Sequence, residues 1–240
     1  MMPLRGTLSP LGMGRGMTQN VFRLTCTTTG AQTLTLQSLG IVAGQTVVVT
    51  WGDGNSNTYS GEATRTHAYA GTGTWTVTFN TPEHIRKLDL RDTKLSEIIN
   101  AANPMPTGIT SLYLASLTGL SWTVSATTPM PTGIAYLTLI NLTGLMAIYD
   151  WSGINVIRTV QYENSLSQVQ IDAVVASIYD NRALYTYATP TLDIAGGSNA
   201  APSGIYQDAD PPTMGKEYIY ELVNDPEAEG FKKWAITYTP

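Results

Sequence analysis

The sequence predicts a mainly β protein in which a small antiparallel sandwich is followed by a short solenoid of parallel strands, with one or two helices near the C-terminus. Two observations carry this prediction. Apolar and threonine residues alternate through residues 21–80, and two peptide motifs farther along recur with a common offset of 25 residues. We expect three parts: an extended segment over residues 1–20, the sandwich over 21–81, and the solenoid with its C-terminal cap over 82–240.

The predicted sandwich is built from short strands with one apolar face. Residues 74–79 alternate threonine with Trp75, Val77 and Phe79, which gives one buried face and one threonine-covered face. The same alternation places the only cysteine, Cys26, on the apolar face of its strand, where we expect a buried structural thiol. Between two strands, residues 52–55 read Gly-Asp-Gly-Asn and predict a tight turn.

Three ordered motifs in this region resemble one known family. They are Trp51-Gly52-Asp53-Gly54, His67-Ala68-Tyr69 and Gly73-Thr74-Trp75-Thr76-Val77-Thr78. In this order they resemble the polycystic-kidney-disease (PKD) type of immunoglobulin-like domain, which has a W-G-D-G turn, an H-x-Y strand and a G-T-Y-x-V strand. The resemblance implies an immunoglobulin-like spacer or interaction module rather than a catalyst.

An internal repeat marks the second half of the chain. The hexapeptide at residues 104–109, Pro-Met-Pro-Thr-Gly-Ile, recurs at 129–134, and the Leu-Thr-Gly-Leu of 117–120 recurs at 142–145. Units that begin at Ile85, Ile109, Ile134 and Ile157 follow each other after 24, 25 and 23 residues. A period in this range predicts one short strand per unit, stacked in parallel because no unit can bury its apolar face alone.

The L-x-L cores of these units resemble leucine-rich repeats over residues 85–194. The asparagine that the family carries after the core is replaced by Thr93, Leu117 and Leu142, so the units are leucine-rich-repeat-like. Beyond them, Ser167 precedes an amphipathic pattern that ends near Asn181 and predicts a helix. Residues 191–194 predict a strand, 216–223 a short helix and 234–238 a final strand. This C-terminal arrangement resembles the capping ends of repeat proteins among phage structural and bacterial surface proteins.

Composition disfavours several function classes. Charged residues are 13% of the chain, with 13 basic and 18 acidic residues, so there is no basic stripe to neutralise phosphates and we expect no nucleic-acid binding. A single cysteine allows neither an intrachain disulfide nor a multi-cysteine zinc site. No apolar run reaches the roughly 20 residues of a membrane helix, and residues 1–17 do not have the pattern of a Sec export signal.

The sequence predicts no catalytic, cofactor-binding or metal-binding residues. Asp53 to Asn57 match the first half of a calcium loop, but Thr58 and Thr64 stand where that loop needs glycine and glutamate, so a hairpin turn is the preferred interpretation. We expect His67 to be a half-buried sheet residue and His84 a solvated residue at the junction. The acidic residues near the C-terminus are expected to be solvated loop residues rather than paired catalytic acids: Asp208, Asp210, Asp225, Glu227 and Glu229.

Two regions are candidate partner-binding sites. Residues 1–20 are either a disordered tail or an anchor that becomes ordered on a partner, because they carry apolar residues that a solvating tail does not need. The residues of this predicted anchor are Leu4, Leu11, Met13, Arg15 and Met17. Near the C-terminus, tyrosines that combine a large ring with a polar tip suit a contact surface, although β proteins also place tyrosine at strand edges. The candidate surface residues there are Tyr206, Tyr218 and Tyr220.

Three function classes are compatible with these features of the sequence. The resemblances favour a non-enzymatic structural component of a phage virion, either a capsid decoration or cement protein or a tail- or fibre-associated protein, assembled in the host cytoplasm. Its expected partners are other virion proteins, further copies of itself, and a glycan or protein of the host surface. A secreted adhesin of the bacterial surface is the alternative, and a carbohydrate-active enzyme is a weaker one because the sequence offers no catalytic set.

Overall fold

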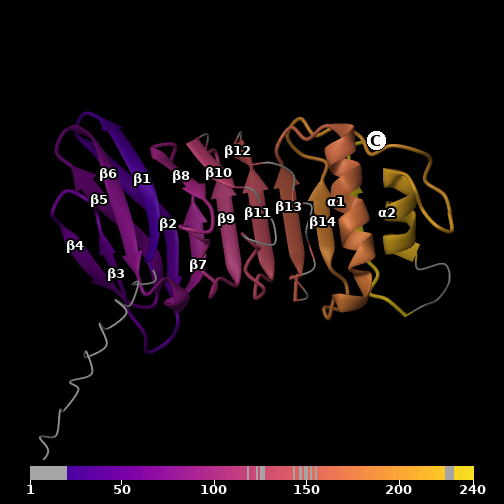
Figure 1. The fold of residues 1–240 in the computed structure, drawn as a ribbon, viewed down its shortest axis with the longest axis horizontal. Coiled ribbons are helices and arrows are strands. Elements are labelled where there is room, and N and C mark those ends of the chain that lie inside the picture. The colour runs from indigo at the N-terminus through magenta and orange to yellow at the C-terminus, as the bar shows by residue number, and fades with distance from the viewer. Residues whose placement is uncertain are drawn as a thin grey trace, which may run out of the picture.

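The computed structural model describes residues 21–240 apart from positions 118, 123, 125–127, 143, 146–147, 149–150, 152, 155 and 225–229. The predicted predominance of β structure is confirmed, with 42% of the chain in strands and 14% helical. The strands form two sheets that share one hydrophobic core. The body is elongated, with strands stacked side by side along its length and helices at the C-terminal end (Figure 1).

Six antiparallel strands make up the N-terminal end of the body. The first sheet contains β1 (Val21–Thr29), β6 (Thr72–Asn80), β3 (Val47–Thr50) and β4 (Ser56–Tyr59), and the second contains β2 (Gln32–Ile41) and β5 (Glu62–Tyr69). Alternation explains these strands, because in β1 the residues Phe22, Leu24 and Cys26 are fully buried while Arg23 and Thr27 are exposed. The predicted burial of Cys26 is confirmed.

A ladder of parallel strands continues the second sheet toward the C-terminus. Its strands are β7 (Ile85–Leu90), β9 (Ser111–Ala115), β11 (Tyr136–Ile140), β13 (Thr159–Glu163), β14 (Thr191–Ile194) and β15 (Ala235–Tyr238). Equivalent apolar residues are register partners from strand to strand: Leu88, Leu112, Leu137, Val160, Leu192 and Ile236. The parallel stacking predicted from the repeat is confirmed.

The prediction of one strand per unit is wrong for three of the units. Each of these also contributes a strand to the first sheet: β8 (Leu95–Ile99), β10 (Gly119–Trp122) and β12 (Gly144–Leu145). A second alternating apolar segment explains them, since Leu120 and Trp122 of β10 are buried while Gly119 and Ser121 between them are exposed. These strands close the open side of the core that a single ladder would leave in water.

Both sheets cross the predicted boundary between residues 81 and 82. In the first sheet β1 pairs with β8, and in the second β2 pairs with β7, both antiparallel. A short 3-10 turn, η1 (Pro82–His84), leads directly into β7. The division of the chain into two domains stays a prediction from the sequence, and the sheets that cross the boundary argue against independent folding of its two parts.

Two asparagines satisfy backbone groups near the turns that end the later parallel strands. Asn164 Oδ1 accepts a hydrogen bond of 2.7 Å from the N–H of Leu142, one of the residues that replaces the expected asparagine. Buried Asn199 accepts from the N–H groups of Asn164 and Leu166, at 3.1 and 2.8 Å, and its amide donates to the carbonyl of Tyr162 at 2.6 Å. Asn164 and Asn199 thus satisfy backbone groups at the turns of neighbouring units, which in leucine-rich repeats is the role of an asparagine in each unit.

The two predicted helices are confirmed. α1 (Gln168–Asp180) begins after Ser167, whose hydroxyl and Gln170 form a capping box, and its buried residues join the common core. α2 (Gly215–Asn224) packs against α1, and η2 (Arg182–Leu184) follows α1. Among the described residues, neither α-helix is long and apolar enough to cross a bilayer.

We expect the chain to unfold in one cooperative transition, because the core and both sheets run through the predicted boundary. Leu88→Ala removes a fully buried side chain of β7 next to that boundary and should lower the free energy of unfolding by about 2–5 kcal/mol. Hydrogen exchange in denaturant should show this loss equally in peptides from β1 and from β13. Loss confined to the C-terminal peptides would instead support two independent domains.

Candidate functional site

The segment from Trp51 to Asn55 forms the turn between β3 and β4. The Trp51 N–H donates to the Asn55 carbonyl at 3.0 Å, and Asp53 Oδ1 accepts from the Asn55 N–H at 3.0 Å. Gly52 has a φ of 86°, and a Cβ there would lie 2.7 Å from the Thr76 nitrogen, so only glycine fits. The hairpin interpretation of this segment is confirmed, including the Asp side chain that bonds its own turn.

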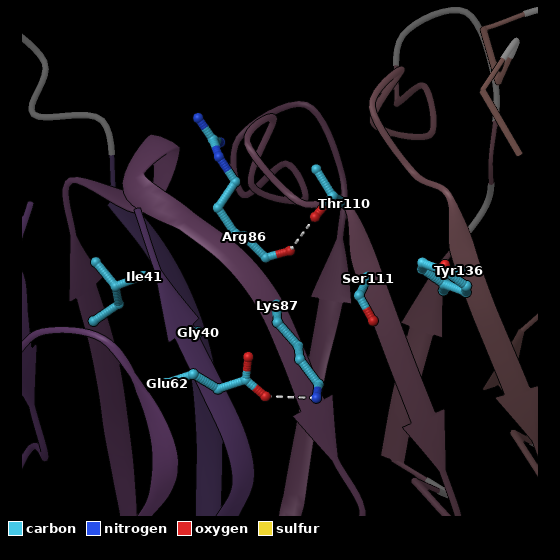
Figure 2. Close-up of a pocket in the computed structure, with 8 residues that line it drawn as sticks. All are labelled: Gly40, Ile41, Glu62, Arg86, Lys87, Thr110, Ser111 and Tyr136. Atoms are coloured by element: carbon cyan, nitrogen blue, oxygen red, sulfur yellow. Dashed lines mark hydrogen bonds and ion pairs between the residues drawn. The ribbon is translucent and has the colours of Figure 1, made fainter. Parts of the chain in front are cut away.

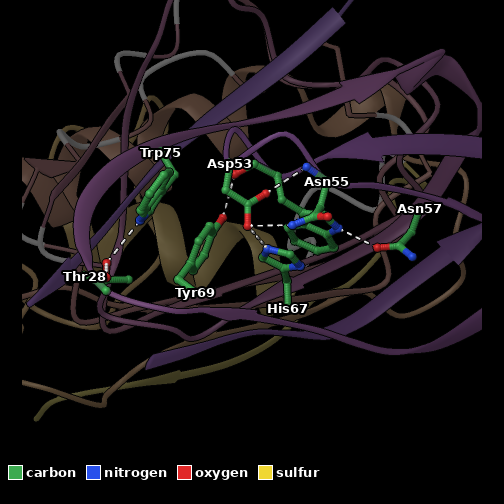
Figure 3. Close-up of polar contacts among 9 residues, drawn as sticks. Thr28, Asp53, Asn55, Asn57, His67, Tyr69 and Trp75 are labelled. Atoms are coloured by element: carbon green, nitrogen blue, oxygen red, sulfur yellow. Dashed lines mark hydrogen bonds and ion pairs between the residues drawn. The ribbon is translucent and has the colours of Figure 1, made fainter. Parts of the chain in front are cut away.

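His67 and Asp53 lie within hydrogen-bond distance of each other beside this turn (Figure 3). Nε2 of His67 lies 2.7 Å from Oδ2 of Asp53. The imidazole is stacked on the Trp51 ring, with the ring centroids 4.7 Å apart and an angle of 4° between the ring planes. Burial raises the pKa of Asp53, but hydrogen bonds from His67 and Asn55 outweigh it and hold that pKa below its usual range. The prediction that His67 is a half-buried residue of β5 is confirmed.

Tyr69 and Trp75 extend this cluster toward β1. The Tyr69 hydroxyl donates to the Trp51 carbonyl at 2.9 Å, and its ring is stacked on Trp75 at 5.1 Å. The Trp75 indole N–H donates to the hydroxyl of Thr28 at 3.1 Å (Figure 3). Burial raises the pKa of the neighbouring Cys26 thiol to about 11, so it is protonated at neutral pH. The cluster ties β1, β3, β5 and β6 together.

Both carboxylate oxygens of Asp53 have hydrogen-bond partners within the protein. Its Oδ2 also accepts from the side-chain amide of Asn55 at 3.0 Å, so both carboxylate oxygens are engaged within the protein. Across the part of the chain that the structure describes, no three histidine, cysteine, aspartate or glutamate side chains are grouped so as to hold a metal ion. The hydrogen bonds and ring contacts of this cluster hold together the strands that supply it.

We expect calcium and chelator alike to leave the melting temperature unchanged, because a cation would have to displace the internal partners of Asp53. Asp53→Ala should lower the free energy of unfolding by about 1–3 kcal/mol, since it leaves His67 without its partner. Differential scanning calorimetry with and without CaCl2 measures both effects, with Asp208→Ala as the control. A calcium-dependent rise in melting temperature that disappears in Asp53→Ala would contradict this view.

The structure separates the three tyrosines predicted near the C-terminus. Tyr206 and Tyr220 meet edge to face, with ring centroids 5.1 Å apart, and Asn224 donates to the Tyr206 hydroxyl at 3.1 Å. Tyr218 lies on another side of α2, where its ring contacts Tyr179 of α1 at 5.4 Å. Tyr206 is therefore available to a partner, whereas Tyr218 serves the packing of the two helices.

A loop over residues 203–214 presents Tyr206 together with other apolar side chains. Ile205 is 69% exposed, Met214 47% and Tyr206 43%. Met214 lies against Gly204, where a Cβ would come within 2.6 Å of the Met214 Cβ, so the two ends of the loop touch. We call the exposed residues Ile205, Tyr206 and Met214 the C-terminal loop surface.

Two buried glutamates of α2 hold this loop. Oε2 of Glu217 accepts from the N–H groups of Thr213 and Met214 at 2.9 and 3.1 Å, and Oε1 accepts from the side-chain amide of Gln207. Glu221 Oε1 accepts from the N–H of Ala209 at 3.2 Å. The sequence analysis did not identify either residue; for Glu217 the available signal was its place in the first turn of the predicted helix, where acidic residues act as caps.

Charge and position further define the C-terminal loop surface. Asp208 and Asp210 are exposed within the loop, which contains no basic residue. The loop lies near the helical end of the body, far from the antiparallel strands (Figure 1). The acidic positions 225–229 and the predicted anchor residues of segment 1–20 lie outside the described residues.

We expect acid to release the loop, because the hydrogen bond from the Thr213 N–H, aided by Gln207 and Met214, holds the pKa of Glu217 below its usual range. A lowered folded-state pKa contributes stability above the unfolded-state pKa of about 4.3, and this stability is lost as the pH falls through the folded-state pKa. The protection factors of residues 203–214, which correct hydrogen exchange for its intrinsic pH dependence, should therefore fall as the pH drops below about 4.3.

Glu217→Gln provides the test of that assignment. The variant should exchange faster in the loop at neutral pH and lose the acid-dependent step, because its amide cannot accept the same hydrogen bonds at both atoms. Asp208→Asn, a change of an exposed acid in the same loop, should keep the step. If Glu217→Gln behaves as the unchanged protein does at every pH, another group holds the loop.

Comparisons with protein-family models, curated proteins and solved structures found no match to this chain.

Proposed function

We propose that the chain is a non-enzymatic structural component of a phage virion, placed as a capsid decoration or cement protein or as a tail- or fibre-associated protein. The observation that carries this proposal is the C-terminal loop surface, an exposed apolar group on a loop that buried carboxylates hold in one conformation. A surface of this kind suits contact with another protein. The sequence resemblances to phage structural proteins supply the identity of that partner class.

The proposal extends to the fold of the antiparallel and parallel parts of the chain. We propose that β1 to β6 form an immunoglobulin-like sandwich of the PKD type, supported by the ring contacts among Trp51, His67, Tyr69 and Trp75, which come from the three family motifs. We also propose that the parallel units are leucine-rich-repeat-like, supported by their common register and spacing. Both kinds of module commonly act through contacts rather than catalysis, which agrees with a structural role.

The energetics of the loop surface favour repeated, individually weak contacts. Burial of each apolar side chain is worth roughly 1.5–3 kcal/mol. The hydrogen bonds of Glu217 and Glu221 fix the loop before binding, so less conformational entropy is lost on association. Three such side chains give a weak contact for one copy. Repetition on a symmetric particle, or assembly of the chain into a homo-oligomer, would raise the effective affinity.

The negative charge of the loop restricts the kind of partner surface that it can contact. Asp208 and Asp210 flank the apolar residues, and like charges placed opposite them would be repelled. We therefore propose that the neighbouring virion protein offers an apolar recess with a neutral or basic rim. Segment 1–20 remains a proposed second attachment, through Leu4, Leu11, Met13, Arg15 and Met17.

Incorporation into purified phage particles tests this proposal. We expect the chain to be found in particles by quantitative mass spectrometry, and the double variant Ile205→Ser, Tyr206→Ser to lower its copy number at least tenfold because the apolar contact is lost. Val169→Ser changes a valine of α1 that is 77% exposed and should leave the copy number unchanged. Deletion of residues 2–17, assayed in parallel, measures the contribution of the proposed anchor.

Two outcomes would overturn the proposal. One is the absence of the chain from purified particles, which would favour a bacterial surface adhesin if the protein were instead found on cells. The other is normal incorporation of the Ile205→Ser, Tyr206→Ser variant, which would show that the C-terminal loop surface is not the contact. Circular dichroism of each variant confirms that the fold is intact.

A further inference from the structure

A hollow on the outer face of the second sheet lies where its antiparallel and parallel strands meet (Figure 2). Its volume is about 380 Å³, which falls within the roughly 300–1,000 Å³ of small-molecule sites. The side chains around it are mostly polar: Glu62, Arg86, Lys87, Thr110, Ser111 and Tyr136. They come from the two halves of the chain, so the hollow exists only because β2 pairs with β7.

Strand register explains why this face is hollowed. Glu62 of β5, Gly40 of β2, Lys87 of β7, Ser111 of β9 and Tyr136 of β11 are register partners in one row across five strands. Neighbouring strands are about 4.8 Å apart, so Lys87 and Tyr136 stand roughly 10 Å apart at the backbone with only a serine between them. Gly40 and Ser111 leave space on this face because their side chains are small, and the longer side chains of Lys87 and Tyr136 border that space.

One wall of the hollow is an ion pair. Lys87 Nζ lies 2.6 Å from Glu62 Oε1, which also accepts from the hydroxyl of Ser38 at 3.0 Å. The two side chains meet above Gly40, where a Cβ would come within 2.8 Å of the Lys87 Cβ. Both charged groups remain partly exposed, at 38% and 55%, so each can still bind a ligand. The wall therefore offers a hydrogen-bond donor and an acceptor side by side.

The opposite wall is an aromatic ring. Tyr136 is 49% exposed, which is high for a large side chain on a sheet. Ser111 adds a hydroxyl between the two walls, and the hydroxyl of Thr110 donates to the Arg86 carbonyl at 3.1 Å and keeps its lone pairs as acceptors (Figure 2). The hollow thus combines one apolar face with donors and acceptors of hydrogen bonds.

We propose that this hollow binds a saccharide. A sugar ring has an apolar C–H face that packs on an aromatic ring, here Tyr136, and a rim of hydroxyls that both donate and accept, here toward Lys87 and Glu62. Other ligands fit less well. An anion would meet the Glu62 carboxylate, a cation would meet the Lys87 ammonium, and an apolar ligand would desolvate the ion pair without replacing its water contacts.

Binding of simple sugars to the full chain tests the proposal. The probes are methyl α-glucopyranoside, methyl β-galactopyranoside and N-acetylglucosamine, followed by saturation-transfer NMR and titrated by chemical shift. An open hollow that meets about a dozen heavy atoms predicts a Kd on the order of 1 mM for at least one probe. Tyr136→Ala should weaken that binding at least tenfold, and Tyr136→Phe, which keeps the ring, should stay within about threefold of the unchanged protein.

Tyr187→Ala is the matched control. Tyr187 is 39% exposed and lies beside Arg158 outside the hollow, so its removal should leave the Kd unchanged. Ser111→Leu, which fills the hollow from its floor, should abolish binding while the melting temperature shows whether the fold is kept.

Three results would overturn the proposal: no binding of any probe, binding that survives Tyr136→Ala, or displacement of the sugar by inorganic phosphate at equal concentration, which would identify an anion site. The assay uses no particle, so its failure is distinguishable from failure of the virion proposal. Incorporation into particles without sugar binding would contradict only the saccharide proposal. Sugar binding without incorporation would contradict only the virion proposal.

Discussion

The pairing of β2 with β7 and of β1 with β8 joins an antiparallel sheet to a parallel ladder, and most of the structure depends on it. A short parallel strand cannot bury its apolar face without neighbouring strands. β7 has a neighbouring strand on each side, because Leu88 is the register partner of Leu39 in β2 and of Leu112 in β9. The first repeat therefore starts on a paired strand rather than at an open edge, where further chains could add.

Polar side chains satisfy backbone groups that the hydrogen bonds between parallel strands leave without partners. Each unit leaves backbone groups at its turns, and Asn164 and Asn199 satisfy several of them from neighbouring units. At the helical end, Glu217 and Glu221 do the same for a loop that would otherwise lack partners for its N–H groups. A loop held in this way can expose apolar residues without collapsing onto the body, which is the property that a contact surface needs.

The two proposed surfaces arise from different features of one architecture. The C-terminal loop surface depends on local capping of α2, whereas the hollow beside Tyr136 depends on strand register across the junction. Small residues at Gly40 and Ser111 would look unremarkable in any sequence pattern, and they become a site only because register places them between Lys87, Glu62 and Tyr136. The cluster around His67, which carries the most specific sequence motifs, is by contrast internal and structural.

The sequence by itself determined the local elements and the faces they bury. The repeated Ile-x-x-Leu-x-Leu pattern predicted the parallel stacking, and Ser167 predicted the start of α1, because periodicity and caps are encoded within a few residues. Only the tertiary structure decided that β8 pairs with β1, that Tyr206 is exposed while Tyr218 packs on α1, and that Glu217 is buried. These outcomes depend on contacts between segments far apart in the chain, where apolar alternation shows that a face is buried but not which strand edge or helix it meets.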